Sequence, residues 1–254
     1  MYIDAHAHLD KYEQPELSQV IGEIEVDRII TLSVSMDPAA YLKSKALPAL
    51  SKWVVPSFGI HPWNAPDAQH DMQALDKLIA ESPMVGEIGL DYHFVTESEK
   101  HEIQRDVFKH FVRQGVAQDK ILNIHSKGAE ADVDSILGDF RARRAILHWY
   151  SGPIPELHKL TEKGFYVTVG VEMLFNPHIQ AIARAVPPHL LLTETDNPGG
   201  YQWLTGTIGT PVLIKSVVEK LSELRGWQHA RTKDTVFDNI NRLAGDDEWV
   251  KQLR

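Results

Sequence analysis

Six residues of metal-ligand type each lie at or next to the end of a short apolar run in this sequence. They are His6, His8, Glu87, His125, His148 and Asp196. In a parallel α/β barrel the C-terminal ends of all strands meet on one face, where side chains distant in sequence can form one site. Imidazole nitrogen and carboxylate oxygen together suit Zn, Mn or Mg, and the chain has no cysteine to supply a thiolate. The sequence therefore predicts one site for divalent metal ions.

His6 and His8 form an H-x-H pattern, in which two imidazoles of an extended chain point to the same side and can share one ion. Glu87 interrupts an otherwise apolar segment, where a lone carboxylate is costly unless it is paired or bound to metal. Its two oxygens could bridge two ions. A structural ion pair for Glu87, and hydrogen-bonded core positions for His125 and His148, are the alternatives for each residue taken alone.

Asp196 ends the last apolar run, and Pro198 stops regular structure just beyond it. We predict that Asp196 binds metal and also accepts a proton from the attacking water, so that Asp196 and Glu87 are the catalytic residues. Glu194 lies two residues earlier on the same side of the strand, and we expect it to orient an imidazole. His61 could contact an anionic group of the substrate or could stabilise its own loop.

These residues must be positioned by eight strand-like runs, most of them continuously apolar, as is typical of parallel strands buried on both faces. The runs are residues 2–5, 28–33, 53–58, 84–88, 120–124, 144–147, 165–169 and 190–193, with helix-length segments between them. The length of 254 residues suits one barrel. We therefore predict a single (β/α)8 TIM-type barrel domain over residues 1–254, although an open doubly wound sheet would give the same pattern. A C-terminal helical tail is expected over residues 232–243, with Thr232 as a partial cap, and residues 59–71 and 196–210 are expected to be substrate-contacting loops.

The composition excludes several functional classes. A formal net charge of -9 argues against a broad basic surface for long duplex nucleic acid, although bound divalent ions would still make a pocket locally positive for phosphate. The absence of cysteine excludes a thiol nucleophile, disulfides and a zinc finger. We expect no signal peptide, because the chain runs straight from Met1 into the first strand-like run, and no apolar run reaches the ~20 residues of a membrane span. We expect a cytoplasmic protein that has no membrane partner, and its protein partners are not predicted.

Seven motifs occur in order along nearly the whole chain: residues 4–9, 59–62, 86–92, 124–126, 148–152, 193–196 and 239–243. With them the chain resembles the TatD-type metal-dependent hydrolases, within the amidohydrolase-like barrels. The resemblance implies two or three divalent ions, commonly Mg, Mn or Zn, and hydrolysis of phosphodiester bonds in DNA, single-stranded or at its ends. It implies that one ion is held by His6, His8, Glu87 and Asp196 and the second by Glu87, His125 and His148. It also places His61 near the substrate phosphate.

The departures from the family pattern concern the substrate. Lys127 and Gly128 replace the usual Arg-Glu pair, and the Arg-Asn-x-Pro segment is missing. We predict that Lys127 supplies the charge of an arginine without its bidentate geometry. Trp149 and Tyr150 replace the usual Cys-Phe and are expected to offer aromatic surface to a nucleobase. Two alternatives follow: an ester or amide hydrolase with the same metal centre, and a binding or scaffold component of an assembly that defends against foreign DNA.

Overall fold

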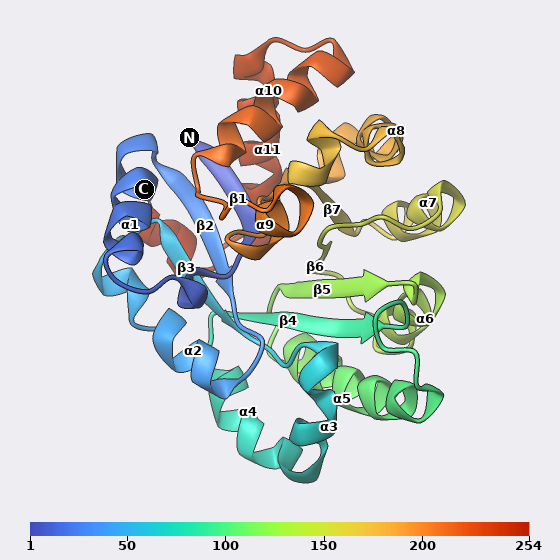
Figure 1. Cartoon of the computed structure of the whole chain (residues 1–254). Coiled ribbons are helices and arrows are strands. Elements are labelled where there is room, and N and C mark those ends of the chain that lie inside the picture. The colour runs from blue at the N-terminus through green and yellow to red at the C-terminus, as the bar shows by residue number, and fades with distance from the viewer. Residues whose placement is uncertain (254) are drawn as a thin grey trace.

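The computed structural model describes residues 1–253 and contains one sheet of eight parallel strands, ordered β1 to β8 as they occur in the chain (Figure 1). The strands are β1 (Tyr2–Ala7), β2 (Ile29–Val34), β3 (Val54–Phe58), β4 (Met84–Asp91), β5 (Leu122–Lys127), β6 (Ala145–Leu147), β7 (Tyr166–Val169) and β8 (Leu191–Thr193). The two ends of the sheet meet where the Thr193 hydroxyl donates to the Ile3 carbonyl at 2.6 Å. The backbone N–H of Asp196 donates to the His6 carbonyl at 2.9 Å just beyond. The predicted (β/α)8 barrel is confirmed.

Helices connect successive strands and surround the sheet (Figure 1). They are α1 (Glu16–Asp27), α2 (Pro38–Ser44), α3 (Ala65–Ala68), α4 (Met72–Glu81), α5 (Ser98–Ala117), α6 (Glu130–Asp139), α7 (Ile154–Glu162) and α8 (Pro177–Ala185). After β8 follow α9 (Gly199–Thr205), α10 (Leu213–Arg225), α11 (His229–Ala244) and α12 (Glu248–Leu253). Within residues 1–253, no helix combines the length and apolar character needed to cross a membrane.

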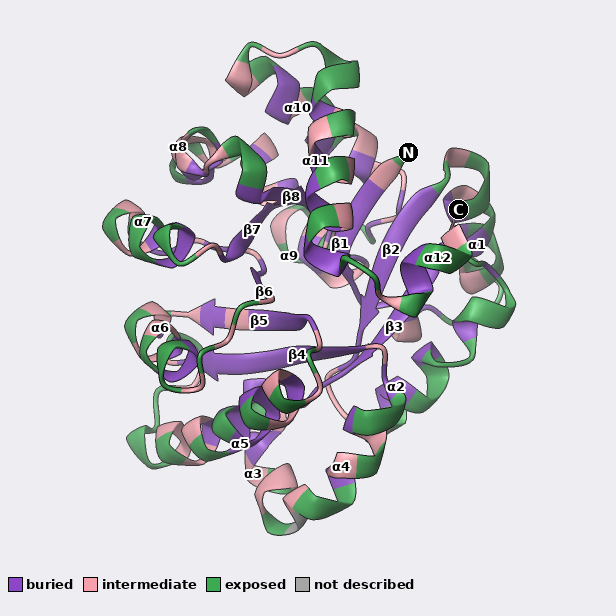
Figure 2. Cartoon of the chain, turned by 180° about the vertical axis from the view of Figure 1, so that it is seen from behind, coloured by how far each residue is buried: buried purple, intermediate pink, exposed green. Residues whose placement is uncertain are grey.

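The strands are buried almost throughout, whereas the outer faces of the helices are exposed (Figure 2). The apolar side chains of the strands pack against the inner faces of the helices. Phe58 of β3, for example, packs on Phe111 of α5 with ring centroids 5.8 Å apart, and both are fully buried. This burial on both faces explains why the strand segments are continuously apolar.

Three strands run two or three residues further than the apolar pattern indicates. β1, β4 and β5 continue to Ala7, Asp91 and Lys127, so His6 and His125 lie inside strands rather than after them, and Glu87 lies inside β4 as predicted. The pairing register shifts between Asp4 and Ala7 in β1, and again between Val85 and Ile88 in β4. Such irregularities re-aim side chains next to functional sites. Here each one brackets a predicted ligand, His6 or Glu87.

The two predicted loops contain short helices, which corrects that expectation. Residues 59–71 hold two 3-10 turns, Pro62–Asn64 and Gln69–Asp71, on either side of α3, and residues 196–210 hold α9. The first turn forms because Pro62 fixes its start and the His61 ring accepts from the backbone of Trp63. Thr232 is likewise not a cap. It lies one turn inside α11, where its hydroxyl bonds to Ser222 at 2.7 Å.

Candidate metal centre

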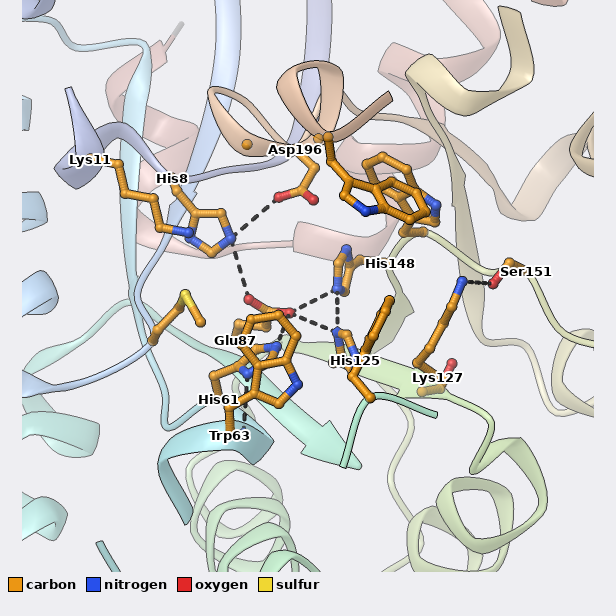
Figure 3. Close-up of a pocket in the computed structure, with 17 residues that line it drawn as sticks. His8, Lys11, His61, Trp63, Glu87, His125, Lys127, His148, Ser151 and Asp196 are labelled. Carbon is orange, nitrogen blue, oxygen red and sulfur yellow. Dashed lines mark hydrogen bonds and ion pairs between the residues drawn. The ribbon is translucent and has the colours of Figure 1, made fainter. Parts of the chain in front are cut away.

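Glu87 lies at the centre of a cluster of histidines at the C-terminal end of the barrel (Figure 3). Its Oε1 lies 2.9 Å from His148 Nε2, 3.1 Å from His125 Nδ1 and 3.3 Å from His61 Nε2. Its Oε2 lies 3.4 Å from His8 Nε2 and 3.6 Å from His6 Nε2. Gly59 makes this position possible, because a Cβ there would lie 2.2 Å from the Glu87 carbonyl oxygen. The two carboxylate oxygens therefore face two different groups of imidazoles.

His6 is held in a defined tautomer. Its Nδ1 lies 2.8 Å from the side-chain oxygen of Asn123, which can only accept, so Nδ1 carries the proton. The Asn123 amide nitrogen donates in turn to the Ala5 carbonyl at 2.8 Å. The His6 Nε2 lone pair is thereby directed at Glu87 and Asp196, and among the described residues this buried atom has no hydrogen-bond partner.

His125 and His148 each face a second carboxylate behind them. Nε2 of His125 lies 3.2 Å from Asp91 Oδ2, which leaves Nδ1 for the side of Glu87. Nδ1 of His148 lies 3.7 Å from Glu194 Oε2, and its Nε2 faces Glu87. A carboxylate behind a ligating imidazole fixes the ring and raises its basicity. Asp91 and Glu194 occupy that position here.

Asp196 completes the cluster from the loop after β8. Its Oδ1 lies 3.3 Å from His8 Nε2 and 3.7 Å from His6 Nε2. Its backbone φ is 51°, a left-handed conformation that aspartate adopts more readily than most residues and that is often found at functional sites. The side chain keeps 22% of its surface exposed, so this carboxylate faces both the histidines and the cavity.

Neighbouring charges shift the pKa values of the residues in the cluster. Burial alone would raise the pKa of Glu87, but the surrounding histidines hold it well below its usual value. Burial likewise lowers the pKa of His148, yet the carboxylates of Glu87 and Glu194 raise it to about 10. Without a bound cation, His148 therefore retains a proton beside these carboxylates, whereas burial lowers the pKa of His61 to about 4. A divalent cation would displace the His148 proton.

The residues fit divalent metal. Ligand atoms of His6, His8 and Glu87 lie within 4.8 Å of one another, and so do those of His61, Glu87 and His125 and those of His6, His148 and Glu194. The buried, unpartnered Nε2 of His6 and the nitrogen and oxygen donors around it match the preferences of Zn, Mn and Mg. All six residues predicted as ligands are brought together, and His61 approaches Glu87 as closely as they do.

A cavity of about 330 Å³ opens above the cluster. Lys127, which is expected to contact substrate, lines it together with His61 (Figure 3). Trp149, with the same expected role, also lines it. The ammonium group of Lys127 donates to the Ser151 hydroxyl at 2.7 Å. Tyr150 does not contribute as expected. It is buried in the core and donates to the Pro153 carbonyl, whereas its neighbours Trp149 and Ser151 line the cavity.

Sequence reasoning missed Asn123 and Asp91, although both carry a signal. Asn123 precedes His125 by two residues and Asp91 follows Glu87 by four, so each shares a strand face with a predicted ligand. It also missed Glu172, which accepts a hydrogen bond from the Trp149 indole at 2.5 Å. No sequence spacing connects Glu172 to Trp149, because they follow different strands.

We expect Asn123→Ala to weaken metal binding by about 10- to 100-fold, because His6 loses the acceptor that fixes its tautomer. Competition with a metal-sensitive chelator would measure the change. Asn241→Ala, which removes an amide from α11 away from the cavity, serves as the control. Wild-type metal affinity in a folded Asn123→Ala protein would show that the hydrogen bond does not orient His6.

Comparison with known proteins gives consistent matches over nearly the whole chain. A family model described as TatD related DNase matches residues 3–245. The metal-dependent hydrolase YcfH of Escherichia coli K12, whose function is uncharacterized, is 28% identical over 95% of this chain and 94% of its own length. MJ1582 of Methanocaldococcus jannaschii, also described as an uncharacterized metal-dependent hydrolase, is 23% identical over 94% of both chains.

Solved structures share the fold. The TatD homologue YJJV of Escherichia coli K12 superposes with a TM-score of 0.77 at 21% identity, over 95% of this chain and 97% of that one. A TatD family hydrolase of Entamoeba histolytica superposes with a TM-score of 0.82 at 16% identity, over 95% and 97% of the two chains. At these identities the likeness establishes the barrel architecture.

Proposed function

Because this chain belongs to the TatD-related DNase family, we propose that it hydrolyses phosphodiester bonds of DNA. The coarser assignment, a metal-dependent hydrolase, follows from the family and from the histidine and carboxylate cluster. The observation that carries the finer proposal is the cavity. Its floor is the cluster around Glu87, and its wall carries Lys127, which has no carboxylate within ion-pair distance among the described residues.

The cluster supports two ion positions. His6, His8, Glu87 and Asp196 would hold one ion, and Glu87, His125 and His148 the other, with Mg, Mn or Zn as candidates. When bound, such ions supply Lewis acidity and lower the pKa of water, which together favour attack on phosphorus. Glu87 would serve both positions, since its two oxygens face different imidazoles.

Side chains of this protein accept the proton, contact the phosphate and orient a histidine ring. Asp196 accepts the proton of the attacking water, because its carboxylate faces the cavity from the edge of the cluster. His61 and Lys127 contact the phosphate, and Glu194 orients the His148 ring. Each contact fixes a charged or reacting group before the reaction begins, which is the main source of catalytic power in such sites.

An ester or amide hydrolase is the second candidate. The cavity wall carries no arginine among the described residues and is rich in aromatic side chains, which would suit an aryl substrate. The two functions are separated by one assay on the same metal-loaded sample. End-labelled single-stranded DNA, RNA and a neutral aryl ester are offered with Mg, Mn and Zn. Release of nucleotides with no ester cleavage supports the deoxyribonuclease, and the reverse result refutes it.

We expect Lys127→Ala to raise KM for DNA by about ten-fold while kcat changes little. A charge-assisted contact to phosphate contributes to substrate and transition-state binding alike. Steady-state kinetics at several salt concentrations would measure this effect, and its salt dependence should weaken in the variant. Lys109→Ala, on the exposed face of α5, is the control. An unchanged KM would remove Lys127 from substrate binding.

A further inference from the structure

The cavity wall contains an indole whose orientation is fixed on several sides. Trp149 directly follows the predicted ligand His148 and has a backbone φ of 40°, which is unfavourable for a bulky residue. Its backbone N–H is held by Glu194 Oε1 at 2.7 Å and by the Thr168 hydroxyl at 2.9 Å. Its indole N–H donates to Glu172 Oε2. The ring is thus held from both its backbone and its edge.

Helix α9 packs directly on this indole. A Cβ at Gly200 would lie 2.4 Å from the Trp149 ring, so only glycine allows so close an approach. Trp203, one turn further along α9, meets the Trp149 ring edge-on at 6.3 Å between centroids. Trp203 is 64% exposed, a large apolar side chain left in contact with water beside the metal centre.

Phe94 reaches the same place from across the barrel. It follows β4, which lies halfway round the strand order from β8, yet its ring lies 6.5 Å from that of Trp203. Phe94 is 50% exposed, and all three rings line the cavity. We call Trp149, Trp203 and Phe94 the aromatic wall. Exposed apolar surface gathered at a cavity indicates a ligand with an apolar face.

We propose that the aromatic wall binds one flat aromatic group of the substrate, a nucleobase in DNA, beside the metal centre, and that Glu172 is the positioning residue for Trp149. The inference rests on the proposed function for the identity of that group. Base stacking on aromatic side chains tolerates any base, because every base presents a π-face. The aromatic wall would therefore favour ligands that carry a base, whichever of the bases it is.

Glu172 is suited to this role because it is itself held. Its second oxygen accepts from the Asn176 side chain at 2.7 Å, so the carboxylate has a fixed direction. An indole oriented in advance loses little conformational freedom when a ligand stacks on it, and this strengthens binding. Glu172 acts through Trp149 and is not among the residues that line the cavity.

Two ligands that differ only by a base test the aromatic wall. Calorimetry on the metal-loaded protein would compare dAMP with 2-deoxyribose 5-phosphate. We expect the wild type to bind dAMP about ten-fold more tightly, within the range that base stacking contributes. Trp149→Ala should bind the two ligands equally. Trp227→Ala, at the turn between α10 and α11, should keep the wild-type preference.

Variants of Glu172 test its positioning role. Glu172→Ala should lose most of the preference for dAMP, whereas Glu172→Gln, whose amide oxygen still accepts from the indole, should keep it. The indole N–H resonance of Trp149, identified by its absence in Trp149→Ala, should shift in Glu172→Ala and stay near its wild-type position in Glu172→Gln. A merely structural Glu172 would alter thermal stability and leave the preference for the base unchanged.

Each outcome of these experiments supports or overturns one part of the proposal. Equal binding of the two ligands by the wild type would overturn the aromatic wall, and a preference that survives in Trp149→Ala would place the base elsewhere. A preference that survives in Glu172→Ala would remove the positioning role. If the protein prefers dAMP but cleaves no phosphodiester, the proposed function fails and the aromatic wall stands. If it cleaves DNA without any preference for dAMP, the reverse holds.

Discussion

Glu87→Gln should lose metal and activity together, with both falling by at least ~10². Loss of a residue that merely orients a ligand costs 10- to 100-fold in metal affinity, and a carboxylate shared between two ion positions contributes more. The amide has no negative charge, and an NH2 group replaces one of the two carboxylate oxygens that could bind metal. The variant would then lack the negative charge that lies among five imidazoles and offsets the positive charge of a protonated ring or a bound metal ion.

Metal content by atomic spectrometry and the initial rate of DNA hydrolysis would be measured on the same sample. Glu102→Gln, an exposed change of the same chemistry on α5, is the control. A folded Glu87→Gln protein with wild-type metal content and rate would show that Glu87 is a structural residue. A variant that loses activity but keeps its metal would instead limit Glu87 to a role in the reaction.

The placement of the ligand-type residues could be anticipated because strand ends in a barrel converge. His148 and Asp196 follow buried strands from distant parts of the chain, and parallel topology alone brings them to one face. The irregular register at His6 and Glu87 could not be anticipated, because a bulge depends on the neighbouring strand as well as on its own sequence.

The supporting residues were harder to predict for a related reason. Asn123 and Asp91 are polar residues in buried strands, and such residues can be satisfied by many partners, so their alignment with His6 and His125 becomes visible only in three dimensions. Helix α9 was not predicted, because its segment is rich in glycine. Gly206 ends this helix with φ of 80°, and Gly200 permits its contact with Trp149.

Asp196→Asn should retain the fold and most of the bound metal but lower the rate of DNA hydrolysis by ~10² to 10⁴, the usual cost of a lost general base. Five other predicted ligands remain, and the amide oxygen keeps the size and position of the carboxylate. The amide cannot accept the proton of the attacking water, however. The partial exposure of Asp196 toward the cavity places it where that water must approach.

The ratio of rate loss to metal loss therefore distinguishes the roles of Asp196. Metal content and single-turnover rate would be measured at limiting and at saturating metal, and Asp106→Asn on the exposed face of α5 provides the matched control. Parallel loss of metal and rate, with the rate restored by excess metal, would reduce Asp196 to a ligand. An unchanged rate would remove it from the reaction altogether. If the variant keeps its metal but loses most of its rate, the contribution of Asp196 is proton transfer. A residue that only binds metal would change the rate only through the occupancy of the metal site.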